Sequence, residues 1–161
     1  MKKINSKYIK EIIEKATLIA SLSKCKRSKR GVVISTRNIE LSSASNGPIE
    51  KVCNSCLREG LESGISLELC SNHAEQKAIN DLRRMLYLHN EIKESVLYHV
   101  KLVNGNVSID PGIPYCIFCS QEILNIGIPN IVLCGKETSY MYEKEEFHEL
   151  SIYNSKKIKN E

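Results

Sequence analysis

One histidine, one glutamate and two cysteines in this 161-residue chain have the types and spacing expected of a catalytic metal site. His73-Ala74-Glu75 and Cys116-Ile117-Phe118-Cys119 each begin a segment with helical periodicity. They offer one imidazole and two thiolates, a ligand set typical of tetrahedral zinc that keeps its fourth position for water. Unpaired N–H groups at helix N-termini stabilise such thiolates. Glu75 is not needed as a ligand and could carry the proton of the activated water. The sequence therefore predicts Zn²⁺ on His73, Cys116 and Cys119, with Glu75 as the catalytic residue.

A second group of cysteines could hold another metal ion. Its members are Cys25, Cys53, Cys56 and Cys70, three of which fall in the long irregular segment 45–72. Four thiolates could close a structural tetrahedral zinc site. Alternatively, they are free buried cysteines, which behave as small hydrophobic residues. The seventh cysteine, Cys134, ends an apolar run and is predicted to lie in the core.

The positive charge of the chain is concentrated between residues 24 and 30, where five of seven residues are Lys or Arg. Such a stretch could bind an anion, either a phosphate on a small substrate or a nucleic-acid backbone, or it could be a solvated loop. Aromatic residues are not interleaved with the basic ones, as they are in single-strand binders. Nucleic acid is therefore not the expected partner.

The pattern of apolar residues predicts one α/β domain. Helical periodicity marks residues 8–22, 73–88 and 117–126, and Gly127 is a predicted helix C-cap. Strands are predicted at 31–34, 39–44, 95–103 and 131–134. The apolar runs are too short to cross a bilayer, and charged residues interrupt any N-terminal signal peptide. We therefore expect a cytoplasmic protein without a membrane partner, in which the cysteines stay reduced.

Several motifs together resemble the cytidine/deoxycytidylate deaminase superfamily. The H-x-E and C-x-x-C parts of the H-x-E…P-C-x-x-C signature of the nucleobase deaminases are matched at 73–75 and 116–119. Residues 25–34 resemble the opening strand motif of that family, and Ala44-Ser45-Asn46-Gly47-Pro48 resembles its G-Y-N-G-P loop. Segments 56–60, 63–64, 68–70 and 73–76 are similar to the dCMP deaminase branch.

This resemblance implies a three-layer α/β/α sandwich with a mixed central sheet, spanning residues 1–161 with a core at about 8–135 and a C-terminal extension at 136–161. It implies zinc-dependent deamination of a cytosine nucleotide, dCMP to dUMP plus ammonia, in a homo-oligomer. Members of this branch often carry a second zinc near this loop, and the resemblance thus supports a second zinc site by analogy. For the small-molecule nucleotide substrate it implies contacts from Asn46 to the sugar hydroxyl and from Arg27 to the phosphate. Asn46 could instead serve only as a turn residue before Gly47. We also place Ala74 among the substrate-binding residues.

Three departures from the family pattern bear on the substrate. Arg30 stands where the family has an apolar residue, Tyr115 separates Pro114 from Cys116, and the region after Gly135 resembles the family poorly. A deaminase of another aminated base or nucleoside, including a base in RNA, therefore stays open. So does a non-catalytic zinc-stabilised nucleotide-binding module, although such a module has no need of Glu75.

Overall fold

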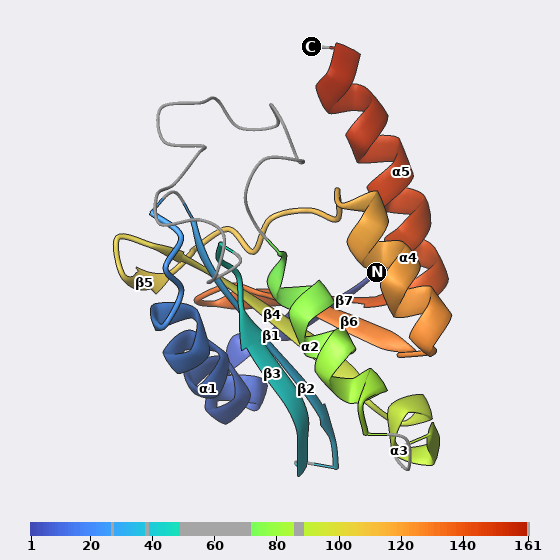
Figure 1. Ribbon diagram of the computed structural model, residues 1–161. Helices are drawn as coiled ribbons and strands as arrows, with labels where there is room; N and C mark the ends of the chain where they lie inside the picture. The colour runs from blue at the N-terminus through green and yellow to red at the C-terminus, as the bar shows by residue number, and fades with distance from the viewer. Residues whose placement is uncertain (27, 38, 49–71, 86–88, 161) are drawn as a thin grey trace.

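A mixed sheet of seven strands forms the centre of the molecule (Figure 1). The computed structural model describes residues 1–26, 28–37, 39–48, 72–85 and 89–160. In chain order the elements are β1 (Lys2–Asn5), the 3-10 helix η1 (Ser6–Ile9), α1 (Lys10–Ser21), β2 (Lys29–Thr36), β3 (Ile39–Ser45), α2 (Ala74–Arg83), α3 (His89–Lys93), β4 (Val96–Val103), β5 (Asn106–Val107), α4 (Ile117–Ile126), β6 (Asn130–Cys134), β7 (Thr138–Glu143) and α5 (Lys144–Asn160).

The strand order is β1-β7-β6-β4-β2-β3, and β5 pairs with one end of β4. Strands β4 and β6 are parallel and are joined through α4, whereas the other pairs are antiparallel. A parallel pair needs a crossover connection, and a helix packed on the sheet supplies it. Helix α4, which carries the two cysteines of the predicted metal site, is this crossover.

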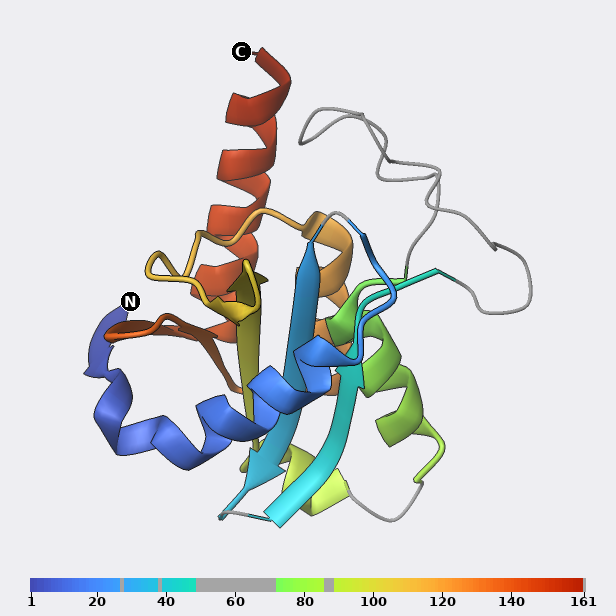
Figure 2. The same cartoon turned by 90° about the vertical axis from the view of Figure 1, so that its left-hand side faces the viewer.

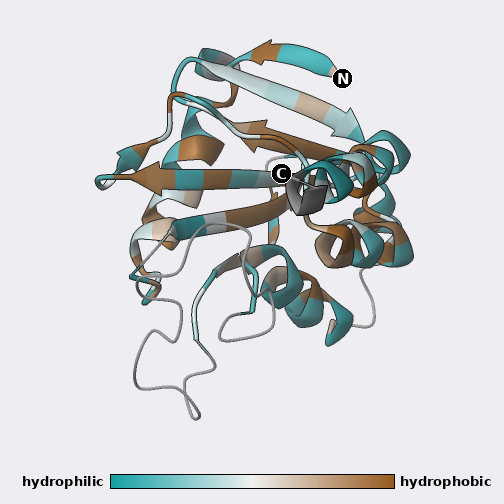
Figure 3. Ribbon diagram, turned by 90° about the horizontal axis from the view of Figure 1, so that it is seen from above, coloured by the Kyte–Doolittle hydropathy of each residue, from teal (hydrophilic) through white to brown (hydrophobic). Residues whose placement is uncertain are grey.

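Helices cover both faces of the sheet (Figure 2). Helix α1 lies on one face, where Ile13, Ala16 and Ala20 join a core with strand residues such as Val33 and Val100. Helices α2, α4 and α5 lie on the other face, over a core that includes Val32, Ile34, Ala78, Ile79, Leu97, Ile123, Ile131 and Phe147. Apolar residues dominate the central strands (Figure 3). The predicted α/β/α sandwich with a mixed sheet is confirmed.

The elements predicted from periodicity are present, with shifted ends. Helix α2 ends at Arg83 rather than near residue 88, and β2 begins two residues earlier than predicted. Gly127 caps α4 in the left-handed conformation, with φ of 87°. Residues 136–161 contain β7, which pairs with β1 and β6, and α5, which packs on α4. No helix in the described ranges is both long and apolar enough to span a bilayer.

The close approach of α1 to the sheet depends on Gly31 in β2. A Cβ atom at this position would lie 2.2 Å from the Ala16 carbonyl oxygen and 2.6 Å from the Ala20 backbone nitrogen. Both neighbours are backbone atoms of α1, so they cannot rotate away. Gly31 therefore sets the spacing of this layer, and because neighbouring strand residues alternate, Arg30 and Val32 face the opposite side.

We expect Gly31→Ala to lower the free energy of unfolding by about 1–3 kcal/mol, the range for overpacked cores. Chemical denaturation followed by circular dichroism measures this loss. Lys29→Ala, an exposed change in the same strand, is the control and should stay within about 0.5 kcal/mol of the wild type. Equal stabilities for Gly31→Ala and Lys29→Ala would contradict the close approach of α1.

Candidate metal centre and active site

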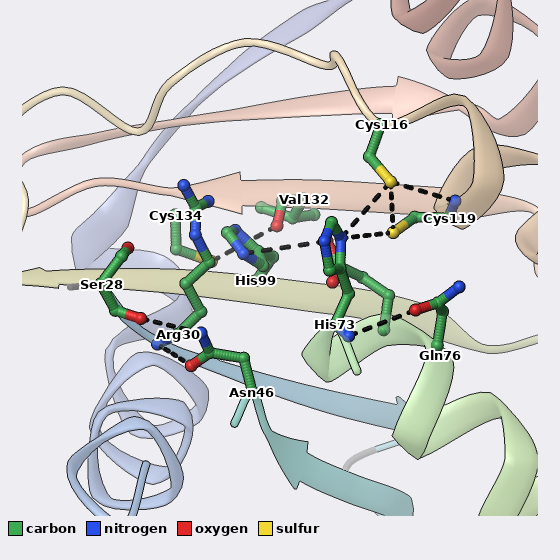
Figure 4. A network of polar contacts seen from close by, with 11 residues as sticks. Ser28, Arg30, Asn46, His73, Gln76, His99, Cys116, Cys119, Val132 and Cys134 are labelled. Carbon is green, nitrogen blue, oxygen red and sulfur yellow. Dashed lines mark hydrogen bonds and ion pairs between the residues drawn. The ribbon is translucent and has the colours of Figure 1, made fainter. Parts of the chain in front are cut away.

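The starts of α2 and α4 bring the predicted ligands together (Figure 4). His73 is the N-cap residue of α2, and its backbone N–H donates to the Gln76 side chain at 3.2 Å. Cys116 is the N-cap residue of α4, and its Sγ accepts a hydrogen bond from the Cys119 backbone N–H at 3.3 Å. The Cys116 sulfur therefore satisfies a free N–H group at the positive end of the helix.

The three ligand atoms converge on one small volume. His73 Nδ1 lies 3.0 Å from Cys119 Sγ and 3.4 Å from Cys116 Sγ, and the two sulfurs are 2.7 Å apart. Within the described residues, this is the group of histidine, cysteine and acidic side chains close enough to hold a metal ion. One imidazole nitrogen and two thiolates suit Zn²⁺. The geometry therefore fits the predicted metal, and His73, Cys116 and Cys119 could bind it.

The pKa values of the two thiols are shifted in opposite directions, so that one of them loses its proton more easily than the other. The hydrogen bond between the two sulfurs lowers the pKa of Cys116 to about 6, with a further contribution from His73. The same hydrogen bond, together with burial, raises the pKa of Cys119 well above its usual value. Because of the hydrogen bond with Cys116, the pKa of His73 is raised. At neutral pH the pocket thus contains a thiolate, the form of a cysteine that binds a metal cation.

Glu75 lies beside this group, on the first turn of α2. Its side chain is 14% exposed, and Oε1 is 3.8 Å from His99 Nε2. Burial alone would raise the pKa of Glu75, but His99 and His73 outweigh it, so the pKa lies below its usual value. The carboxylate is therefore ionised at neutral pH and can accept a proton.

His99 in β4 is a site residue that neither motif nor spacing identifies. It is 3% exposed, and neither ring nitrogen has a hydrogen-bond partner. Burial lowers the pKa of His99 to about 4 despite the opposing effect of Glu75, so the ring is neutral at pH 7. Its signal in the sequence is a polar residue at an inward strand position, where an apolar residue is the usual choice.

Asn46 ties the start of β2 to the end of β3. Its Oδ1 accepts hydrogen bonds from the Arg30 backbone N–H and the Ser23 hydroxyl, both at 2.8 Å, and its Nδ2 donates to the Ser28 carbonyl at 2.8 Å. Asn46 is 7% exposed. These bonds fix the backbone from which Arg30 projects. Contact with a sugar hydroxyl, which would use the second Nδ2 hydrogen, stays a prediction.

Helix α5 holds the segment just before the first cysteine ligand. Asn154 Nδ2 donates to the Pro114 carbonyl at 2.7 Å, and the Ser155 hydroxyl donates to the Tyr115 carbonyl. His148 shares a 2.8 Å hydrogen bond with Ser120 of α4. Residues 136–161, expected to be an extension of the core, therefore help to orient Cys116.

The remaining predicted residues are placed as follows. Ala74 is fully buried beside His73, so its predicted substrate contact stays a prediction. Cys134 is buried in β6, where burial raises its thiol pKa to about 12, as expected of a core cysteine. Cys25 is half-buried and free. Arg27, Cys53, Cys56 and Cys70 lie outside the described residues, and the second zinc site stays a prediction.

No protein-family model matches this sequence, and no curated protein matches it. Solved structures do. The chain is similar to the dCMP deaminase of cyanophage S-TIM5 in its apo form, with 20% identity and a TM-score of 0.56 over 80% of this chain and 82% of that chain. The same enzyme in complex with dCMP and dUMP matches at 22% identity and a TM-score of 0.57, over 80% of this chain and 81% of that chain. A cytidine deaminase from Burkholderia pseudomallei matches at 16% identity and a TM-score of 0.56, over 86% of this chain and 94% of that chain. The chain has the cytidine deaminase fold. Within this deaminase fold, the two helix starts carry the His73, Cys116 and Cys119 group.

Buried His99 predicts a specific loss of stability in acid. Its pKa is about 4 in the folded protein and about 6.5 when unfolded, so between these values the unfolded chain binds more protons. Stability should therefore fall as the pH drops from about 6.5 to 4, by about 3 kcal/mol from this residue. Urea unfolding at a series of pH values measures the loss.

His99→Leu removes the titrating group and should lose less stability over the same range. Metal release in acid affects both proteins, so the difference between their slopes reports His99. Parallel slopes in the two proteins would contradict a neutral buried imidazole.

Proposed function

We propose that this chain is a zinc-dependent hydrolytic deaminase of a cytosine nucleotide, converting dCMP to dUMP and ammonia. The observation that carries the proposal is the meeting of His73, Cys116 and Cys119 beside a buried carboxylate that is not needed as a ligand. A site that only stabilised the fold would use a closed set of four ligands and no such carboxylate. The fold shared with dCMP and cytidine deaminases adds support.

Each residue of the group has a defined role in the proposed reaction. Zinc bound by His73, Cys116 and Cys119 would supply a Lewis acid that activates water at neutral pH. Glu75 accepts one proton of the attacking water and passes it to the pyrimidine ring nitrogen, and it then carries the second proton of that water to the departing amine, which leaves as ammonia. Water and the nucleotide are consumed, and ammonia and the uracil product are released. The depressed pKa of Glu75 keeps its carboxylate ready for the first of these transfers.

The proposed substrate is a nucleotide, which carries a phosphate, rather than a nucleoside. The cyanophage enzyme with the same fold was crystallised with dCMP and dUMP, which supports a nucleotide ligand by analogy. Ammonia release from a panel of cytosine nucleosides and nucleotides tests the proposal directly. Preference for dCMP would support it, whereas preference for another aminated base would change the substrate. Absence of turnover in zinc-loaded protein would leave a nucleotide-binding module.

We expect Glu75→Gln to lower kcat by on the order of 10²–10⁴-fold while the protein keeps its full zinc content, because a proton carrier is lost and no ligand is. Ammonia release and metal analysis by mass spectrometry measure the two quantities. His73→Ala is the matched control at the same helix start, and it should lose zinc as well as activity. Substantial turnover by Glu75→Gln would rule out the proposed proton transfer.

The second cysteine group makes a separate prediction about zinc content. If Cys25, Cys53, Cys56 and Cys70 close a structural site, the protein should bind about two zinc ions per chain. Cys56→Ser should then remove one ion and lower the free energy of unfolding more than it changes kcat, because metal binding at such a site contributes to folding. One zinc per chain, together with reactive thiols at these four positions, would show that the group is not a metal site.

A further inference from the structure

Two positively charged side chains lie opposite each other on the face of the sheet that carries the site. Arg30 of β2 pairs with Lys101 of β4 in the antiparallel register, and directly opposed residues project to the same face. The face is that of α2, because the neighbour Gly31 faces α1. Like charges placed directly opposite are unfavourable unless an anion compensates them. Among the described residues, no carboxylate lies within ion-pair distance of either side chain.

Arg30 contacts one neighbour through its backbone and another through its side chain. The Arg30 N–H donates to Asn46 Oδ1 at 2.8 Å, and the Arg30 carbonyl accepts from the Asn46 backbone N–H at 3.1 Å. Its guanidinium carbon lies 5.9 Å from the centroid of the Tyr115 ring. A guanidinium placed over an aromatic ring at this distance can still use its N–H groups for hydrogen bonds to an anion. Arg30 and Tyr115 are also two of the departures from the family pattern, and they meet in space.

Unpartnered polar groups lie next to this pair of cations. Both ring nitrogens of His99 are buried without a hydrogen-bond partner, and His99 is two residues from Lys101 on the same face of β4. The hydroxyl of Ser28, two residues before Arg30, is also buried without a partner. In Figure 4 the His99 ring faces the His73 group. Buried polar groups are normally hydrogen-bonded, so such a cluster indicates a polar ligand.

We propose that Arg30 and Lys101 form the anion-binding end of this active site and bind the phosphate of the nucleotide substrate, with Tyr115 orienting the guanidinium. The assignment rests on the function proposed above and adds the residues that select a nucleotide over a nucleoside. The proposed phosphate contact is thus made by Arg30, whereas the family resemblance implied Arg27. Tyr115, whose ring centroid lies 5.9 Å from the Arg30 guanidinium carbon, directly precedes Cys116 in the chain, and His99, two residues from Lys101, lies 3.8 Å from Glu75, so the two cations lie next to the proposed chemistry.

The test compares dCMP with deoxycytidine, which lacks the phosphate. Arg30→Met should lower the ratio of kcat/KM for dCMP to that for deoxycytidine by on the order of 10–100-fold, the loss of a charge-assisted hydrogen bond. Arg30→Lys, which keeps the charge without the planar fork, should lower it less. Lys101→Met should also lower the ratio. Lys29→Met removes one charge from the opposite face of β2 and should leave the ratio unchanged.

Inorganic phosphate provides a second readout. It should inhibit the deoxycytidine reaction of the wild type, and inhibition should weaken in Arg30→Met. Equal losses on both substrates in Arg30→Met, with unchanged zinc content, would mean that Arg30 only supports the site, and the assignment would fall while the deaminase function stood. If the wild type deaminates neither substrate, calorimetric binding of dCMP and deoxycytidine to wild type and Arg30→Met decides the anion site by itself. If Arg30→Met still binds dCMP more tightly than deoxycytidine by the same factor as the wild type, the assignment of the phosphate to Arg30 is wrong.

Discussion

The proposed active site depends on one geometric constraint, the meeting of three ligand atoms from two helix starts. His73 and Cys116 are 43 residues apart in the chain, yet His73 Nδ1 lies 3.4 Å from Cys116 Sγ. Both are N-cap residues, and α2 and α4 pack against each other on one face of the sheet. The free N–H groups and dipoles of both helices therefore point at the same volume, where they favour thiolates and a bound cation. Any shift of one helix along the sheet would separate the ligands.

The C-terminal elements help to maintain this constraint. Strand β7 lies between β1 and β6, and the Ser6 hydroxyl is 2.8 Å from that of Ser139 in the interior. Helix α5 packs along α4, and Asn154 and Ser155 bind the carbonyls that precede Cys116. Residues after Gly135, which resemble the family poorly, thus help to position Cys116, which belongs to the family's C-x-x-C motif. Different sequences can do so because a carbonyl accepts hydrogen bonds from many side chains.

The proposed phosphate end of the site has a different physical basis from the proposed metal end. The metal end uses thiolates, an imidazole and a carboxylate, whereas the other end has a pair of cations and a buried neutral histidine. In the proposed function, the metal group faces the aminated ring of the nucleotide and the two cations face its phosphate. Arg30 and Tyr115 lie in different segments of the chain, and both differ from the family pattern. The structure places the Arg30 guanidinium next to the Tyr115 ring, so the two differences contribute to one contact.

The sequence by itself determined the strands and helices with regular apolar periodicity, and it identified the three residues that lie close enough to hold a metal ion, because residue type and helix-start chemistry are local properties. It did not predict β1, β7 or α5. Strands β1 and β7 are short and gain their order from pairing with distant segments, which no local pattern encodes. The tertiary structure alone decided that His99 is buried beside Glu75 and that Arg30 lies opposite Lys101 and over Tyr115. Arg30 faces Lys101 through the register of strands about 70 residues apart, and Glu75 and Tyr115 approach the sheet from segments outside it, so these contacts appear only when the fold is assembled.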